Sequence, residues 1–375
     1  MRCTLLHAHW GNSLIQTNAE NTAPGGSHNK RLKEALAQIE HRVNEAKNDD
    51  DLVKAINLLS GFPSPIAYDN SRLNMITAGV CATSALIGAA VYFGLGDLAY
   101  TALTGAAFLI ALIVYGAVRY SRKNRLTGLS DKIHYRTSLF DYGLEPVPFS
   151  GKSKARELGG RFKAFQMGNY AREIRELLRG SYEGAEHSFA YDHYHFHYVD
   201  QRTETYTTTD SKGNVRVRTR TVYDHYDRYG FIVPFKFARA MRISEGGLGF
   251  FQKGWKSSSV SFNKNFNVAA DSEMEVAKFL TPKVIVEIES AGEALRGMDL
   301  EFNNSGELCF SFDDSNMIAA NRSGGLENPA AFAEKVAGHS TQANLDAALN
   351  FIHTLMKYSD NNFDQTIQTQ TAKGE

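Results

Sequence analysis

Two uncharged stretches, each of about twenty residues, restrict this chain more than any other feature. They run over residues 75–95 and 98–118, and neither contains Asp, Glu, Lys, Arg or His. A helix of about 20 residues spans a hydrocarbon core of about 30 Å and satisfies its own backbone hydrogen bonds there. Gly96 and Asp97 separate the two runs and suit a tight turn. The sequence therefore predicts a two-helix transmembrane hairpin over residues 72–122.

The alternative is a buried helical hairpin in a soluble protein. Soluble core helices rarely extend this far without a charged residue, so the membrane hairpin is favoured. Transporters and proton relays usually carry an ionisable side chain within a span, and these runs carry none of the charged types. Small residues four positions apart, such as Ala85 and Ala89, would let the two helices approach closely. We therefore expect an anchor.

The basic residues around the two runs predict the orientation. Arg72 precedes the first run, whereas Arg119, Arg122, Lys123 and Arg125 follow the second. Short loops rich in Lys and Arg stay on the cytoplasmic side of a membrane. We therefore expect a multi-pass protein with both termini in the cytoplasm.

Charge and cysteine content exclude some classes of protein. Lys and Arg together number 41, as do Asp and Glu, so no global charge attracts nucleic acid and we expect no nucleic-acid partner. Cys3, Cys81 and Cys309 lie far apart, and one of them lies within a predicted span. This spacing argues against a disulfide framework.

The remaining chain divides by pattern and composition. Leu32, Leu36, Ile39 and Val43 recur at helical spacing, whereas Tyr194, Phe196 and Tyr198 alternate as in a strand. The fold class we predict is α+β: N-terminal helices, the transmembrane hairpin, then a cytoplasmic domain of antiparallel β-hairpins and packed helices. The expected segments are disordered 1–28, helical 29–66, an α+β domain over 126–320, C-terminal helices over 321–358, and a disordered tail over 359–375.

Within the α+β domain, the spacing of the apolar residues indicates which segments are helices and which are strands. A helix is expected over 154–180, broken or loosened at Gly159 and Gly160, with Ile174, Leu177 and Leu178 as its apolar stripe. Residues 215–223 (VRVRTRTVY) alternate and should pair with the aromatic strand across a loop at 210–214. Further expected elements are an edge or bulged strand over 230–239 that contains Pro234, an extended segment over 262–267, helices over 272–279, 282–295, 329–337 and 342–357, and a hairpin over 300–312.

Three histidines on the aromatic strand form the sharpest local pattern. His193, His195 and His197 alternate with aromatic residues and so share one face of a strand. Imidazoles at this spacing suit zinc, and the hairpin register brings His225 close to His197. The other reading is a strand with an aromatic core face and a polar solvent face, which requires no ligand and no cofactor.

Three arginines occupy alternate positions on the second strand: Arg216, Arg218 and Arg220. They could contact the phosphates of anionic lipid headgroups. The other reading is a solvated sheet face, in which Glu204 and the threonines opposite are ordinary cross-strand partners.

Catalytic motifs are missing from the sequence, and no catalytic residue is predicted. Residues 151–153 (Gly-Lys-Ser) match the end of a phosphate-binding loop, but Pro146 stands where that loop needs its first glycine. No nucleophile elbow, zinc-protease motif or Cys-x-x-Cys pair occurs. We therefore expect an interaction protein rather than an enzyme.

Several of these segments together resemble a bacterial family of small membrane proteins. They are the hairpin, the strand over 212–223, and the blocks 262–268 (FNKNFNV) and 275–282 (EVAKFLTP). The family is a domain-of-unknown-function family, number thirty-one thirty-seven. The resemblance implies this architecture and a bacterial inner membrane, and implies no activity. The long N-terminal helices and the helical tail depart from the family pattern.

These patterns lead to one functional expectation. The chain should be a membrane-anchored cytoplasmic interaction or scaffolding protein, with the lipid bilayer and a protein of unknown identity as partners. Contact with anionic lipid would involve the arginine strand. The alternative is a metal-dependent site at His193, His195, His197 and His225.

Overall fold

The computed structural model describes residues 28–95, 98–209, 213, 215–245, 254–315, 317–318, 324–339 and 341–360. The chain divides into two units. Unit 1 comprises residues 1–134 and 322–338, and unit 2 comprises residues 135–321 and 339–375. Both segments predicted as disordered lie almost entirely outside the described residues, as do the turn at Gly96 and most of the 210–214 loop.

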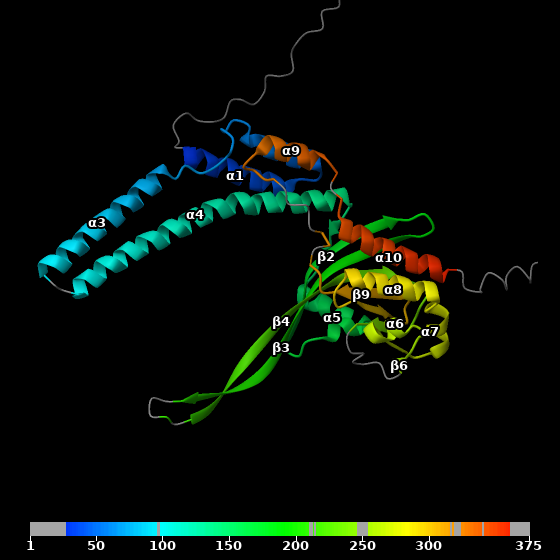
Figure 1. Ribbon diagram of the computed structural model, residues 1–375. Coiled ribbons are helices and arrows are strands. Elements are labelled where there is room, and N and C mark those ends of the chain that lie inside the picture. Colours follow the sequence, from blue (N-terminus) through cyan, green and yellow to red (C-terminus); the bar gives the residue numbers. More distant parts are fainter. Residues whose placement is uncertain are drawn as a thin grey trace, which may run out of the picture. The chain divides into compact units, whose positions relative to one another are not determined.

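Two long apolar helices of unit 1 coincide with the predicted spans. Helix α3 runs Ser71–Leu95 and helix α4 runs Leu98–Asp141 (Figure 1). Both are long and apolar enough to cross a membrane by length and composition. Helix α4 continues well past the predicted end of its span, and its residues from Tyr135 onward belong to unit 2.

A small helical bundle completes unit 1. It contains α1 (His28–Glu45), α2 (Asp49–Ile56), the short 3-10 helix η1 (Asn57–Leu59) and α9 (Pro329–Ala337). The apolar stripe predicted for α1 is buried, and the side chain of Asn48 caps α2 by accepting a hydrogen bond from the Asp51 amide. From α9, Phe332 is fully buried and its ring meets the His134 ring of α4 edge-on at 4.8 Å.

Unit 2 is built on one antiparallel sheet of nine strands, in the order β1-β2-β3-β4-β9-β8-β5-β7-β6. The predicted class of mixed helix and antiparallel sheet is therefore confirmed. The strands are β1 (Glu145–Pro146), β2 (Ala171–Glu183), β3 (Ser188–Thr209), β4 (Val215–Pro234), β5 (Met241–Ser244), β6 (Gly254–Trp255), β7 (Asn267–Ala270), β8 (Asp299–Phe302) and β9 (Glu307–Phe312).

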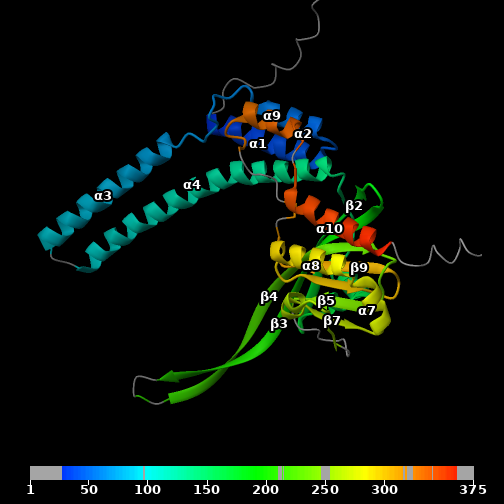
Figure 2. The same cartoon turned by 45° about the vertical axis from the view of Figure 1, so that its right-hand side comes forward.

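Helices cover both faces of this sheet. On one face, α5 (Gly151–Arg161) and η2 (Lys163–Gln166) pack on Tyr194, Phe196 and Tyr198. On the other face, the core includes residues of α6 (Val260–Asn265), α7 (Glu273–Phe279), α8 (Pro282–Ala294) and α10 (Ala343–Ser359). Figures 1 and 2 both show α8 and α10 side by side. The aromatic face of β3 is therefore a core face, as predicted.

The helix predicted over 154–180 is confirmed only as far as Arg161, and the rest of that prediction is wrong. Helix α5 ends at Arg161, Gly168 takes a positive φ of 83°, and β2 begins at Ala171. A β-bulge between Ile174 and Glu176 explains the misleading spacing. The extra residue puts Ile174 and Leu177 on the same face of the strand, although alternation would place them on opposite faces.

Other boundaries also differ from the prediction. The extended segment expected over 262–267 is mostly α6, because the Ser259 side chain accepts a hydrogen bond from the Phe262 amide and starts a helix. The third strand expected over 230–239 is the inner half of β4, which pairs with β9 and ends at Pro234. The predicted C-terminal helices separate, since α9 belongs to unit 1 and α10 to unit 2.

Candidate functional site

The long hairpin of β3 and β4 carries both groups of candidate residues. Its inner half lies in the sheet between β2 and β9. Beyond Val199, β3 has only β4 as a partner, over the pairs from Asp200 opposite Asp224 to Thr209 opposite Val215. Figure 1 shows this two-stranded ribbon projecting from the rest of the sheet and twisting along its length. We call residues 200–209 with 215–224 the β-arm.

The two faces of the β-arm differ in charge. One face, here called the Arg face, carries five cross-strand pairs: Arg216 with Thr208, Arg218 with Tyr206, Arg220 with Glu204, Arg202 with Val222, and Asp200 with Asp224. The opposite face, here called the Thr face, has no charged residue. Its members are Gln201, Thr203, Thr205, Thr207, Thr209, Val215, Val217, Thr219, Thr221 and Tyr223.

The four arginines of the Arg face have different surroundings. Arg202 donates to the Asp224 carboxylate at 2.6 Å. The Arg220 guanidinium donates to the Glu204 carboxylate at 2.8 Å and lies over the Tyr206 ring at 5.6 Å from its centroid. Arg216 and Arg218 are exposed, and their guanidinium groups have no ion pair within the described part of the chain. Two of the four positive charges on this face are therefore available to an anion.

The second group of candidates lies at the base of the β-arm. His197 is opposite Asp227, as the predicted register required, and its Nδ1 lies 2.9 Å from Asp227 Oδ1. His195 Nε2 lies 2.7 Å from the same carboxylate oxygen, and His197 Nε2 lies 3.2 Å from His225 Nδ1. His195 and His197 thus share one carboxylate, and His225 joins them through His197.

Asp227 is the centre of this cluster. Burial raises the pKa of its carboxyl group, but the hydrogen bonds of His195 and His197 outweigh burial and lower the pKa overall. Arg175 of β2 adds an ion pair at 3.3 Å. Arg175 was not predicted as part of a site, because the spacing of the apolar residues around it favoured a helix.

His193 does not belong to the cluster. It lies on the same strand face as His195, but it is buried and its ring contacts the Phe231 ring at 5.3 Å between centroids. Neither ring nitrogen has a hydrogen-bond partner among the described residues. Burial lowers the pKa of His193 to about 3, so the ring is neutral at physiological pH.

The geometry of the cluster suits hydrogen bonding between side chains. Within the described residues, no group of three or more His, Cys, Asp or Glu side chains is arranged to hold a metal ion. The zinc hypothesis for His193, His195, His197 and His225 thus gains no geometric support and stays a prediction. The cluster does fix the base of the β-arm, because it joins β2, β3 and β4.

Comparison with known proteins finds no matching family model, no similar curated protein and no similar solved structure. The resemblance to the bacterial membrane family therefore stays a prediction. Function has to be argued from the geometry of this chain alone.

Proposed function

We propose that this chain is a membrane-anchored interaction protein of a bacterial inner membrane. In this proposal α3 and α4 cross the bilayer as a hairpin, both termini are cytoplasmic, and unit 2 presents the β-arm in the cytoplasm. The Arg face of the β-arm contacts anionic lipid headgroups, and the Thr face is available to a protein partner. No catalytic step is assigned to it.

The observation that carries the proposal is the exposure of the apolar helices. Only 6% of the most apolar window of α3 is buried within the protein, and 0% of that of α4. Large apolar side chains such as Met75 and Phe93 are 74% and 86% exposed. A soluble core helix would bury these side chains, and water would penalise their exposure by about 25 cal/mol per Å². A lipid environment removes this penalty.

Polar contacts at one end of the hairpin support the same placement. The Tyr115 hydroxyl donates to Asn74 at 3.1 Å and accepts from Arg119 at 2.7 Å. Arg122 donates to Asn70 and lies over the Tyr68 ring. Tyr and Arg side chains favour the membrane–water interface, where one end of the side chain is apolar and the other hydrated. This end also carries the basic residues that favour the cytoplasmic side.

The β-arm supports the interaction role. Its Thr face exposes Val215 and Val217 by 66% and 69% without any nearby charge on that face. Its Arg face provides Arg216 and Arg218 for anionic headgroups, each worth about 1 kcal/mol near such a surface.

Topology reporters test the proposal. A cytoplasm-active reporter fused before Asn29 and another fused after Arg125 should both be active, because basic flanks hold those positions inside. A periplasm-active reporter inserted between Gly96 and Asp97 should be active in the same cells. As a control, the reporters exchanged between these positions should be inactive. Periplasmic activity at Asn29 or Arg125, or recovery of the full chain in the soluble fraction, would refute the proposal.

A further inference from the structure

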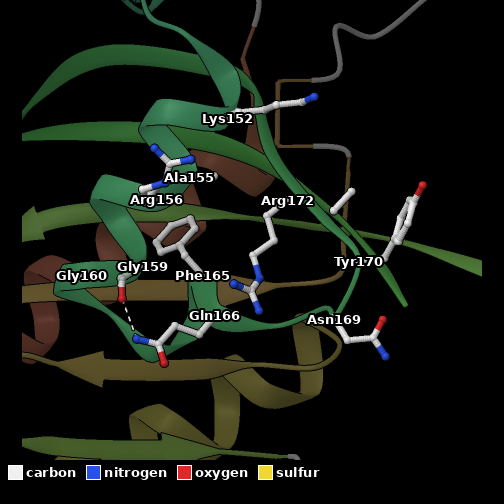
Figure 3. A pocket seen from close by; sticks show the side chains of 11 residues that line it. Lys152, Ala155, Arg156, Gly159, Gly160, Phe165, Gln166, Asn169, Tyr170 and Arg172 are labelled. Atoms are coloured by element: carbon white, nitrogen blue, oxygen red, sulfur yellow. Dashed lines mark hydrogen bonds between the residues drawn. The ribbon is translucent and has the colours of Figure 1, made fainter. Parts of the chain in front are cut away.

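A cavity of about 590 Å³ lies in unit 2 between α5 and the beginning of β2. Cavities of this size hold small-molecule ligands. Figure 3 shows Arg156 of α5 and Arg172 of β2 on either side of the Phe165 ring. The side chains that bring polar groups to the cavity are Lys152, Arg156, Gln166, Asn169, Tyr170 and Arg172.

The charges that line this cavity all have one sign. Lys152, Arg156 and Arg172 are cationic, and none of the described residues that line the cavity is acidic. The other cations of the same helix are paired: Lys154 with Glu157 at 2.7 Å, and Arg161 with Glu307. No hydrogen bond or ion pair joins the side chains of Lys152 and Arg156 to another described residue. The helix therefore neutralises the cations outside the cavity, whereas the exposed Lys152 and Arg156 that line it have no counter-charge among the described residues.

The wall opposite α5 is held in place by its own hydrogen bonds. The Arg172 guanidinium donates to the backbone carbonyl of Met167 at 2.7 Å and to that of Gly168. Asn169 exchanges two hydrogen bonds with the backbone of Gln201. These contacts use two of the five donors of Arg172 and leave Nη1 available, so the cavity is preformed.

The base of the cavity is apolar and its rim is open. Phe165 and Ala155 are buried beneath it, and a low-dielectric base strengthens the attraction between a cation and an anion. Gly159 and Gly160 remove side chains from the α5 side, and a Cβ at Gly160 would meet no atom within 4 Å. The space is thus left open by glycine where a side chain would fit.

We propose that this cavity binds a ligand that carries a phosphate group, held by Lys152, Arg156 and Arg172. Arg and Lys are the side chains that bind phosphate oxygens most often, Arg through paired N–H donors and Lys as a point charge. Lys152 belongs to the Gly-Lys-Ser sequence whose match to a phosphate loop fails. The proposed site uses side chains in place of the backbone amides of such a loop. The proposal does not depend on the membrane role of the β-arm.

Calorimetry with the full-length protein in a nonionic detergent tests this proposal. Inorganic pyrophosphate is the soluble probe, and short-chain phosphatidic acid, compared with short-chain phosphatidylcholine, is the lipid probe. Arg156→Gln should raise the Kd of the bound probe at least about tenfold, because a charge-assisted contact is lost. Lys154→Gln is the matched control, since it removes the same charge from the same helix outside the cavity.

A second pair of variants separates the effect of side-chain charge from the effect of side-chain size. Gly160→Glu places a carboxylate beside the cations without a steric clash and should abolish binding, whereas Gly160→Gln, of the same size, should bind at least about tenfold more tightly than Gly160→Glu. Pyrophosphate binding that Arg156→Gln and Gly160→Glu weaken, and that Lys154→Gln does not, supports a soluble phosphorylated ligand. If phosphatidic acid binds at least tenfold more tightly than pyrophosphate and the variants change its binding in the same way, the ligand is a lipid headgroup. Absence of binding of both probes by the wild type, or equal binding by Arg156→Gln and Lys154→Gln, overturns the proposal.

Discussion

At the scale of single residues, this protein keeps an uncharged polar side chain inside its core. His193 is buried against Phe231, and both ring nitrogens lack hydrogen-bond partners among the described residues. A buried polar group without a partner costs about 1–3 kcal/mol of stability. The same burial lowers the pKa of His193 to about 3. Folding therefore becomes sensitive to pH at this position.

Replacing His193 by Leu should stabilise the protein, most of all in mild acid. Below pH 6.5 the unfolded chain binds a proton at His193, whereas the folded chain binds it only near pH 3, so wild-type stability falls as pH drops through this window. The loss of stability is up to about 1.4 kcal/mol per pH unit.

Thermal unfolding of the detergent-solubilised protein at pH 8 and pH 5 should show a larger gain in stability for His193→Leu at pH 5. His41→Gln, on an exposed side chain, is the control. A pH dependence that His193→Leu leaves unchanged would contradict this account.

At the scale of elements, close backbone approach fixes the pairing of β4 with β9. A Cβ added to Gly230 would lie 2.1 Å from the carbonyl oxygen of Phe310, which is part of the backbone and cannot rotate away. Glycine is therefore required at this register.

Gly230→Ala should destabilise unit 2 by about 1–3 kcal/mol or more, because the strand must move to admit one methyl group. Gly160→Ala is the matched control: it meets no atom within 4 Å and should raise stability by up to about 1 kcal/mol through helix propensity. Thermal unfolding measures both. An unchanged melting temperature for Gly230→Ala would show that β4 and β9 are further apart than described.

The β-arm is the element on which the proposed lipid contact depends. Arg216→Gln, Arg218→Gln and Arg220→Gln together should weaken that contact by about 2 kcal/mol, or about 30-fold, because Arg220 is already paired with Glu204. Energy transfer from a fluorophore at Thr207→Cys to acceptor lipids measures it in reconstituted protein. Wild-type transfer should rise with anionic lipid and fall with salt. The charge-matched control changes Lys264, Lys278 and Lys283 to Gln. If energy transfer in the wild-type protein does not depend on lipid charge, the proposed contact between the Arg face and anionic lipid is wrong.

At the scale of the whole molecule, unit 1 is assembled from distant parts of the chain. Helix α9 contributes the buried Phe332, whereas α1, α2 and α4 come from the first 134 residues. The Leu326 amide bonds to Ser130 and the Ile66 amide bonds to the Glu327 carbonyl. The helical bundle of unit 1 is thus complete only when the C-terminal region is in place.

Phe332→Ala should therefore loosen helices far from it in sequence. Loss of a buried phenylalanine costs about 3–5 kcal/mol. Hydrogen exchange of the amides in α1 and α2 should become faster, whereas the amides of β3 and β4 should be unaffected. Glu334→Ala, exposed on the same helix, is the control. Faster exchange in unit 2 alone would show that α9 belongs with unit 2.

Features that depend on local period and composition could be predicted from the sequence. Uncharged runs of helical length indicated α3 and α4, alternation indicated β3 and β4, and the position of the loop at 210–214 brought His225 close to His197. These features can be predicted because residues at a regular spacing along the chain face the same environment. The charged and uncharged faces of the β-arm follow from the same alternation.

Features that depend on contacts between distant segments could not be predicted in this way. The bulge in β2 shifts its alternation, so the sequence alone favoured a helix there. The burial of His193 depends on Phe231 and the other residues packed on that sheet face, and no residue adjacent to it in the chain indicates this. Likewise, the cavity beside α5 exists because the beginning of β2 folds back along the helix. Its cations Lys152 and Arg156 have no carboxylate partner among the described residues, because Glu157 and Glu307 pair with Lys154 and Arg161. Such arrangements follow from packing in three dimensions, which local patterns do not encode.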